Sequence, residues 1–102
     1  MRVLENKVAV ITGASSGIGK AIAQLFAHSG ATVVLLDVDH NGISDVVDAI
    51  VAEGNNAWGE VCDVSQAHEV LQVMARIKSD VGTVDIMVNN AGIMDDFIPR
   101  QE

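Results

Sequence analysis

Short apolar runs that alternate with amphipathic helical segments constrain the fold of this chain more than any other feature of its sequence. Residues 8–11, 33–36 and 86–88 form three runs without polar alternation. Such runs are typical of strands that are buried on both faces of a parallel sheet covered by helices. Residues 57–61 are a weaker strand candidate, because a glycine and a glutamate interrupt the apolar pattern. The polar character of this segment indicates an edge strand.

Three segments between the runs carry apolar residues at helical spacing. A glycine just past the last apolar position is a common helix end, and Gly30, Gly54 and Gly82 occupy these places. Ser65 is a candidate N-cap for the third segment. The apolar positions are Ile18, Ile22, Leu25 and Phe26 in the first segment, Ile43, Val46, Val47, Ile50 and Val51 in the second, and Val70, Val73, Met74, Ile77 and Val81 in the third.

This order of segments predicts an α/β fold with the element sequence βαβαβαβ. Parallel strands joined by right-handed crossovers give a three-layer, Rossmann-type parallel sheet with the strand order 3-2-1-4, which is one half of a doubly wound sheet. A chain of 102 residues has room for one domain and no second core. Residues 1–102 are therefore predicted to form a single domain.

The charge and the cysteine count exclude several classes of partner. Fourteen acidic residues against six basic ones give a net charge of −8, which disfavours nucleic acid and anionic membranes. No apolar run approaches the roughly 18 residues of a membrane span.

The single cysteine, Cys62, cannot form an internal disulfide and indicates a reducing compartment, the cytoplasm. His28, His40 and His68 have no cysteine or second histidine at ligand spacing, so no metal site is expected.

The sequence TGASSGIG at residues 12–19 lies between the first apolar run and the first helical segment. Glycines there let the backbone turn tightly and bring amide N–H groups close to a phosphate. The following helix adds its unsatisfied donors and the positive end of its dipole. In this strand–helix context the turn predicts a dinucleotide pyrophosphate site. A mononucleotide P-loop would need glycine at position 14 and serine or threonine at position 21, where this chain has Ala14 and Ala21.

Asp37 stands at the end of the second apolar run. An acidic residue in that place can accept hydrogen bonds from the ribose hydroxyls of adenosine. A 2′-phosphate would face this carboxylate, and Ser15, Ser16 and Val38 offer no cation to offset the repulsion. The cofactor is therefore predicted to be NAD rather than NADP.

Three motifs, in this order along the chain, closely resemble the pattern of the short-chain dehydrogenase/reductase family. They are the TGASSGIG turn, the pair Asp63-Val64 and the segment Asn-Asn-Ala-Gly at residues 89–92. They are spread over residues 12–92, so the resemblance extends over nearly the whole chain. The resemblance implies that residues 1–102 are a partial NAD(P)-binding Rossmann domain, without the C-terminal catalytic half.

The resemblance also implies a role for each matching residue. Asp63 would contact the adenine ring through its carboxylate and Val64 through its backbone, while Asn89 would help to tie the strands together. Residues 90–92 would border the ribose next to the nicotinamide. The implied cofactor-binding residues are Gly13, Ser15, Ser16, Gly17, Ile18, Gly19, Asp37, Asp63, Val64, Asn90, Ala91 and Gly92.

The reaction of this family uses a serine and a Tyr-x-x-x-Lys motif with an assisting asparagine, all beyond the Asn-Asn-Ala-Gly segment. This sequence has no tyrosine, and no residue in it matches those positions, so no catalytic residue is assigned. We therefore expect the N-terminal, cofactor-binding part of an NAD-dependent oxidoreductase for alcohol or carbonyl substrates. By themselves these residues are expected to bind NAD but not to catalyse.

A non-catalytic nucleotide-binding or assembly module that kept the fold is the alternative hypothesis. The apolar segment 84–88 would lie at an edge of the sheet, and an unpaired apolar edge invites pairing with another chain. If these 102 residues exist alone, we expect self-association through this edge.

Overall fold

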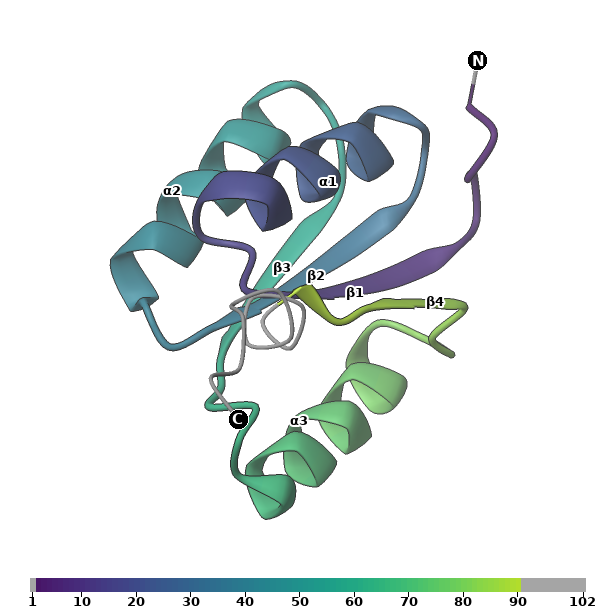
Figure 1. The fold of residues 1–102 in the computed structure, drawn as a ribbon. Helices are drawn as coiled ribbons and strands as arrows, with labels where there is room; N and C mark the ends of the chain where they lie inside the picture. The colour runs from purple at the N-terminus through teal and green to yellow at the C-terminus, as the bar shows by residue number, and fades with distance from the viewer. Residues whose placement is uncertain (1, 91–102) are drawn as a thin grey trace, which may run out of the picture.

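The computed structural model describes residues 2–90 of the chain. Within them, a four-stranded sheet lies between two layers of helices, with α1 and α2 over one face and α3 over the other (Figure 1). The elements in chain order are β1 (Val8–Thr12), α1 (Gly17–His28), β2 (Thr32–Asp37), α2 (His40–Ala52), β3 (Ala57–Val61), α3 (Ala67–Asp80) and β4 (Ile86–Val88).

The strands pair in the order β3-β2-β1-β4, and every pairing among the described residues is parallel. Val10 of β1 pairs with Val34 of β2 on one side and with Met87 of β4 on the other, and Val34 also pairs with Trp58 of β3. The predicted α/β class, element order and strand order are confirmed. Because the strands are parallel, the carboxyl ends of β1, β2 and β3 meet at one edge of the sheet.

The two faces of the sheet carry separate apolar cores. Successive strand residues point to opposite faces, so Ile11 and Leu35 join the core under α1 and α2, whereas Val10, Val34 and Leu36 join the core under α3. All five side chains are fully buried. Burial of each such side chain stabilises the fold by about 1.5–3 kcal/mol. Helices on both faces explain why these strands show no polar alternation.

The predicted C-terminal ends of the helices agree with the structure, whereas the predicted N-cap of α3 does not. All three helices end two residues before the glycines that mark their predicted stops. The prediction of Ser65 as the N-cap of α3 is wrong, because the N-cap is Gln66, which makes no side-chain capping bond. The Ser65 hydroxyl instead donates to Oδ1 of Asp63 at 2.7 Å. A serine hydroxyl can bond several nearby groups, and here it closes the turn before the helix.

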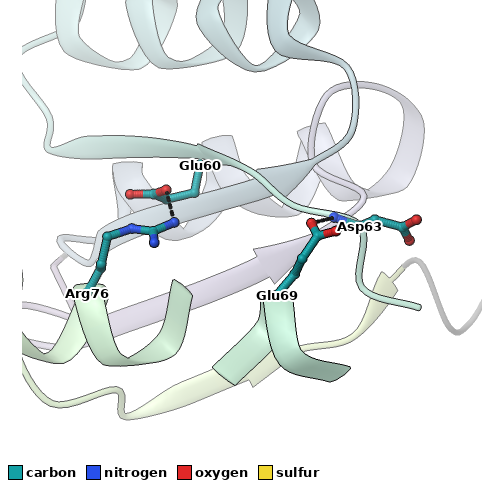
Figure 2. A network of polar contacts seen from close by, with 4 residues as sticks. All are labelled: Glu60, Asp63, Glu69 and Arg76. Atoms are coloured by element: carbon teal, nitrogen blue, oxygen red, sulfur yellow. Dashed lines mark hydrogen bonds and ion pairs between the residues drawn. The ribbon is translucent and has the colours of Figure 1, made fainter. Parts of the chain in front are cut away.

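The edge strand β3 is tied to α3 by an ion pair. Nη2 of Arg76 donates to Oε1 of Glu60 at 3.0 Å, across the gap between helix and strand (Figure 2). Both side chains are partly exposed, so the pair stabilises the fold by no more than about 1 kcal/mol. The face on which α3 lies is fixed by the apolar core between it and the sheet, and the ion pair only adds a contact at its edge.

Two further features of residues 2–90 bear on function. No helix in this range combines the length and the apolar character that crossing a membrane requires. The same range holds no group of three or more histidine, cysteine or acidic side chains arranged for a metal ion.

Candidate functional site

The turn between β1 and α1 contains the glycines of the TGASSGIG segment. Gly13 and Gly17 have φ angles of 62° and 61°, a region that residues with side chains rarely adopt. The N–H of Ala14 donates to the carbonyl of Leu36 at 3.4 Å, which ties the turn to β2. Ser16 is the N-cap of α1 but its side chain makes no capping bond, and the first turn has no acidic residue. The start of α1 therefore suits an anion such as pyrophosphate.

Gly19 lies at the tightest contact of this turn. A Cβ at this position would overlap the Gly13 carbonyl oxygen and would lie 2.7 Å from Nδ2 of Asn90. That same Nδ2 donates to the Gly13 oxygen at 3.1 Å, so the Asn90 side chain braces the turn from beyond β4. Asn90 is 5% exposed, and its Oδ1 has no hydrogen-bond partner among the described residues. A buried acceptor of this kind costs about 1–3 kcal/mol unless a donor reaches it.

Thr12 and Asn89 join the carboxyl ends of β1 and β4. The buried Thr12 hydroxyl lies 3.2 Å from Oδ1 of Asn89 and 3.4 Å from the carbonyl oxygen of Val88. This contact confirms the expectation that Asn89 helps to tie the strands together. It also fixes where the chain leaves β4, next to the glycine-rich turn.

The carboxylate of Asp37, at the end of β2, is held by donors from two loops. Its Oδ2 accepts from the Ser15 hydroxyl at 2.8 Å and from the Ser15 N–H at 3.2 Å, and its Oδ1 accepts from the Asp39 N–H at 3.1 Å. Partial burial acts to raise the pKa of this carboxyl, but the hydrogen bonds outweigh it and hold the pKa below its ordinary value. Asp37 is therefore an ionised acceptor of fixed orientation at neutral pH.

Asp63, just after β3, is held mainly by its own turn. Its Oδ1 accepts from the Ser65 hydroxyl at 2.7 Å and from the Ser65 N–H at 3.0 Å, and these bonds lower the pKa of the carboxyl. The Asp63 N–H donates to Oε1 of Glu69 in α3 at 3.2 Å (Figure 2). In the same view the Asp63 carboxylate points away from Glu69. The backbone is thus anchored to α3 while the carboxylate stays available to a ligand.

A pocket of about 190 Å³ joins the ends of these strands. It brings the two carboxylates, the first glycine of the turn and several apolar side chains to one place. A pocket lined by apolar side chains and two carboxylates suits a flat ring that carries polar groups. The lining residues are Gly13, Leu36, Asp37, Val38, Cys62, Asp63 and Val64.

The pocket contains some of the residues singled out in the sequence but not all of them. Ser15 adjoins it through its bonds to Asp37, and residues 16–18 at the start of α1 are exposed but do not line it. Ala91 and Gly92 lie outside the described residues. Gly13, Asp37, Asp63 and Val64 are the predicted residues that line it.

The sequence did not identify three of the lining residues, Leu36, Val38 and Cys62. For Cys62, the alternation of side chains along β3 is a signal that could have predicted its place. On β3, Trp58 and Glu60 point toward the α3 side, and the same alternation places Cys62 in the core under α3. Burial raises the pKa of the Cys62 thiol, and the carboxylates of Glu69 and Asp63 raise it further. The thiol is therefore a neutral part of the pocket wall and not a nucleophile.

Comparison with known proteins identifies the family. A family model described as short chain dehydrogenase matches residues 7–102. The chain belongs to the short-chain dehydrogenase family. The resemblance read from the three sequence motifs is thereby confirmed, and it makes the chain part of a family of oxidoreductases.

Curated relatives from this family match nearly all of the chain. The protein called "Uncharacterized oxidoreductase YxbG" from Bacillus subtilis (strain 168) is 46% identical over 90 residues, which are 88% of this chain and 33% of the relative. The 7alpha-hydroxysteroid dehydrogenase of Escherichia coli (strain K12) is 44% identical over 87% of this chain and 35% of the relative. The chain thus spans about a third of the length of these relatives.

Solved structures of short-chain dehydrogenases share the fold. A hydroxysteroid dehydrogenase from Escherichia coli superposes with a TM-score of 0.82 at 42% identity, over 84% of this chain and 37% of that one. A 2-keto-3-deoxy-D-gluconate dehydrogenase from Streptococcus agalactiae gives 0.80 at 44% identity, over 87% of this chain and 34% of that one. The Rossmann-type architecture is therefore that of the family.

Proposed function

We propose that this chain is the NAD-binding part of a dehydrogenase that transfers hydride between nicotinamide and an alcohol or carbonyl substrate. The observation that carries the proposal is the pocket at the strand ends, where Asp37 and Asp63 flank apolar walls beside the glycine-rich turn. Membership of an oxidoreductase family supports the reaction class. Bound NAD supplies the carbon that gains or loses hydride. The residues of this chain bind and orient the cofactor, and no catalytic residue is assigned among them.

Each part of the adenosine diphosphate half of NAD has a matching group in this proposal. The ionised Asp37 accepts hydrogen bonds from the ribose hydroxyls, and Asp63 accepts one from the adenine amine. Val38 and Val64 give apolar contacts to the ring. The N–H groups of the turn and of the first turn of α1 bind the pyrophosphate. Asn90, which bonds the Gly13 carbonyl, is assigned together with Ala91 and Gly92 to the second ribose, next to the nicotinamide.

The same pocket favours NAD over NADP. The 2′-phosphate of NADP would meet the carboxylate of Asp37, whose pKa is held low by its hydrogen bonds. The neighbours Ser15 and Val38 carry no positive charge that would offset the repulsion. Two negative groups a few ångströms apart repel strongly in a partly buried site.

Calorimetric titration of the 102-residue chain with NADH and NADPH tests the proposal. We expect saturable binding of NADH and weaker binding of NADPH. The Asp37→Ala variant is the matched control, because it should lose affinity for NADH and discriminate less against NADPH. The absence of NADH binding at millimolar cofactor, with the chain folded by circular dichroism, would contradict the proposal.

A second candidate function is an assembly module, and one observation at β4 favours self-association. Among the described residues β4 pairs only with β1, and Met87 at its centre is 49% exposed. Val84 packs into the core under α3, so the exposed part of the predicted edge is shorter than residues 84–88. An apolar strand edge of this kind pairs readily with a second chain. Analytical ultracentrifugation should show dimers or larger species, and a clean monomer at high concentration would count against this candidate.

We also propose the cytoplasm as the location of this protein. Cys62 is the single cysteine of the sequence, and its thiol is free and buried. A thiol without a disulfide partner suits a reducing compartment. Fractionation of cells that produce the protein tests the location, and recovery from an oxidising compartment would contradict it.

A further inference from the structure

We propose that Gly42 and Ser15 act as positioning residues that orient the Asp37 carboxylate and so set the preference for NAD. This inference rests on the proposed role of Asp37 toward the ribose. It concerns a contact between the glycine-rich turn and the first turn of α2. None of the sequence motifs includes Gly42.

Gly42 is an unfavourable residue for its place in the helix. It is the third residue of α2, where glycine destabilises a helix relative to alanine. Its backbone does not explain the choice either, since its φ lies outside the positive range in which glycine is favoured. The remaining explanation is space. A Cβ on Gly42 would lie 2.7 Å from Cβ of Ser15 and 2.7 Å from Oδ2 of Asp39.

Both neighbours of Gly42 hold the Asp37 carboxylate. Ser15 donates its hydroxyl and its N–H to Oδ2 of Asp37, and Asp39 donates its N–H to Oδ1. Asp39 is also the N-cap of α2, and its Oδ1 accepts from the Gly42 N–H at 3.0 Å. The four residues therefore form a closed set of contacts around the carboxylate.

This geometry makes the orientation of Asp37 depend on how closely α2 approaches the turn. The Cβ of Ser15 is attached directly to the backbone of the turn, so it cannot rotate away from an added methyl group. An added methyl group at position 42 must displace the turn or the start of α2. Either movement lengthens a hydrogen bond to Asp37. The carboxylate then keeps its charge but loses its fixed direction toward the ribose.

The test compares Gly42→Ala with Asn41→Ala, a control at the neighbouring exposed position in the same helical turn. Gly42→Ala should lower the ratio of NADH to NADPH affinity by about tenfold, the effect expected from weakening a charge-assisted hydrogen bond. Asn41→Ala should leave the ratio unchanged. Circular dichroism should show that both variants stay folded.

A second readout, carbon-detected NMR titration of the Asp37 carboxyl, needs no cofactor. Weaker bonds from Ser15 and Asp39 should raise the pKa of Asp37 in Gly42→Ala, whereas a purely structural role for Gly42 would leave this pKa unchanged. The double variant with Ser15→Ala should add less than the sum of the two single changes, because both weaken the hydrogen bonds that hold the same carboxylate. Additive effects, or an unchanged pKa in Gly42→Ala, would overturn the inference. If the parent chain fails to bind NADH while Gly42→Ala still raises the pKa, the proposed function fails and the positioning role stands.

Discussion

The two carboxylates of the pocket, Asp37 and Asp63, are held in different ways. Asp37 is partly buried and takes two of its bonds from Ser15, which lies 22 residues earlier in the sequence. Asp63 takes its bonds from Ser65, which is two residues away and exposed. The orientation of Asp37 is thus a product of the assembled fold, whereas that of Asp63 is a property of one turn. Changes in the fold should therefore act on Asp37 first.

The largest effect should follow from Gly19→Val. This change damages the glycine-rich turn, which lies next to Asp37, and leaves the turn that holds Asp63 unchanged. The added side chain overlaps the Gly13 carbonyl and crowds Nδ2 of Asn90, and both are fixed. We expect a loss of about 1–3 kcal/mol in the free energy of unfolding, as for other overpacked sites, and NADH affinity too weak to measure. Urea unfolding and calorimetric titration measure the two quantities.

Ala21→Val is the control for this change, because position 21 lies in the same helix and is exposed. It should cost only the lower helix propensity of valine, about 0.5 kcal/mol, and leave NADH binding intact. The amide signal of Ser65 should stay in place in both variants. Movement of that signal in Gly19→Val would mean that the two sides of the pocket are not independent.

Asp37→Ala should have the next largest effect. It removes a charged acceptor whose proposed bonds to the ribose hydroxyls would contribute about 1.5–3 kcal/mol, so NADH affinity should fall about 10- to 100-fold. NADPH affinity should fall less or rise, because the repulsion of its 2′-phosphate is gone. Parallel titrations with both cofactors give the ratio. Asp45→Ala, which removes the same charge from an exposed position on α2, should change neither affinity. An unchanged ratio in Asp37→Ala would exclude Asp37 as the ribose ligand.

The hydrogen bonds that hold the Asp37 carboxylate should also make the stability of the fold depend on pH. The folded-state pKa of Asp37 is lower than its ordinary value, so its contribution to stability is fully present above the unfolded pKa of about 3.9. This contribution is lost as the pH falls below that value and through the folded-state pKa. Urea unfolding from pH 7 down to pH 3 should therefore show a shallower loss of stability in Asp37→Asn than in the parent chain. Parallel curves for the two would contradict this account of Asp37.

The sequence predicts the sheet well because its signals are local. The runs at residues 8–11 and 33–36 reveal strands covered on both faces, and the turn glycines together with Asp37 mark the edge of the sheet where the pocket lies. The contacts that shape the site depend on the assembled fold. Asn90 bonds the Gly13 carbonyl across 77 residues of chain, and no periodicity in either segment points to the other.

The hydrogen-bond partner of a side chain is also hard to predict where several acceptors lie close in sequence. Ser65 is suited both to capping α3 and to bonding Asp63, and the structure has the second. Its position in the sequence is compatible with either. Gly42 is the instructive case, because nothing in the neighbouring sequence shows which group lies against it. Only the fold identifies Ser15 as the neighbour.

The smallest effect should come from Ser65→Ala, which gives the sharpest test of the comparison. The Ser65 hydroxyl bond to Asp63 is lost, but the N–H bond in the same turn remains, and water can reach the carboxylate beside the exposed Ser65. The pKa of Asp63 should rise toward its ordinary value, since the hydroxyl bond is the main cause of its lowering. NADH affinity should change by less than about threefold, within the range of one exposed hydrogen bond.

Ser15→Ala, the equivalent change beside Asp37, should weaken NADH binding more, because water cannot replace a donor in a partly buried contact as easily. If the two serine variants weaken NADH binding equally, the two carboxylates are held alike and the distinction between a fold-dependent and a turn-dependent acceptor fails.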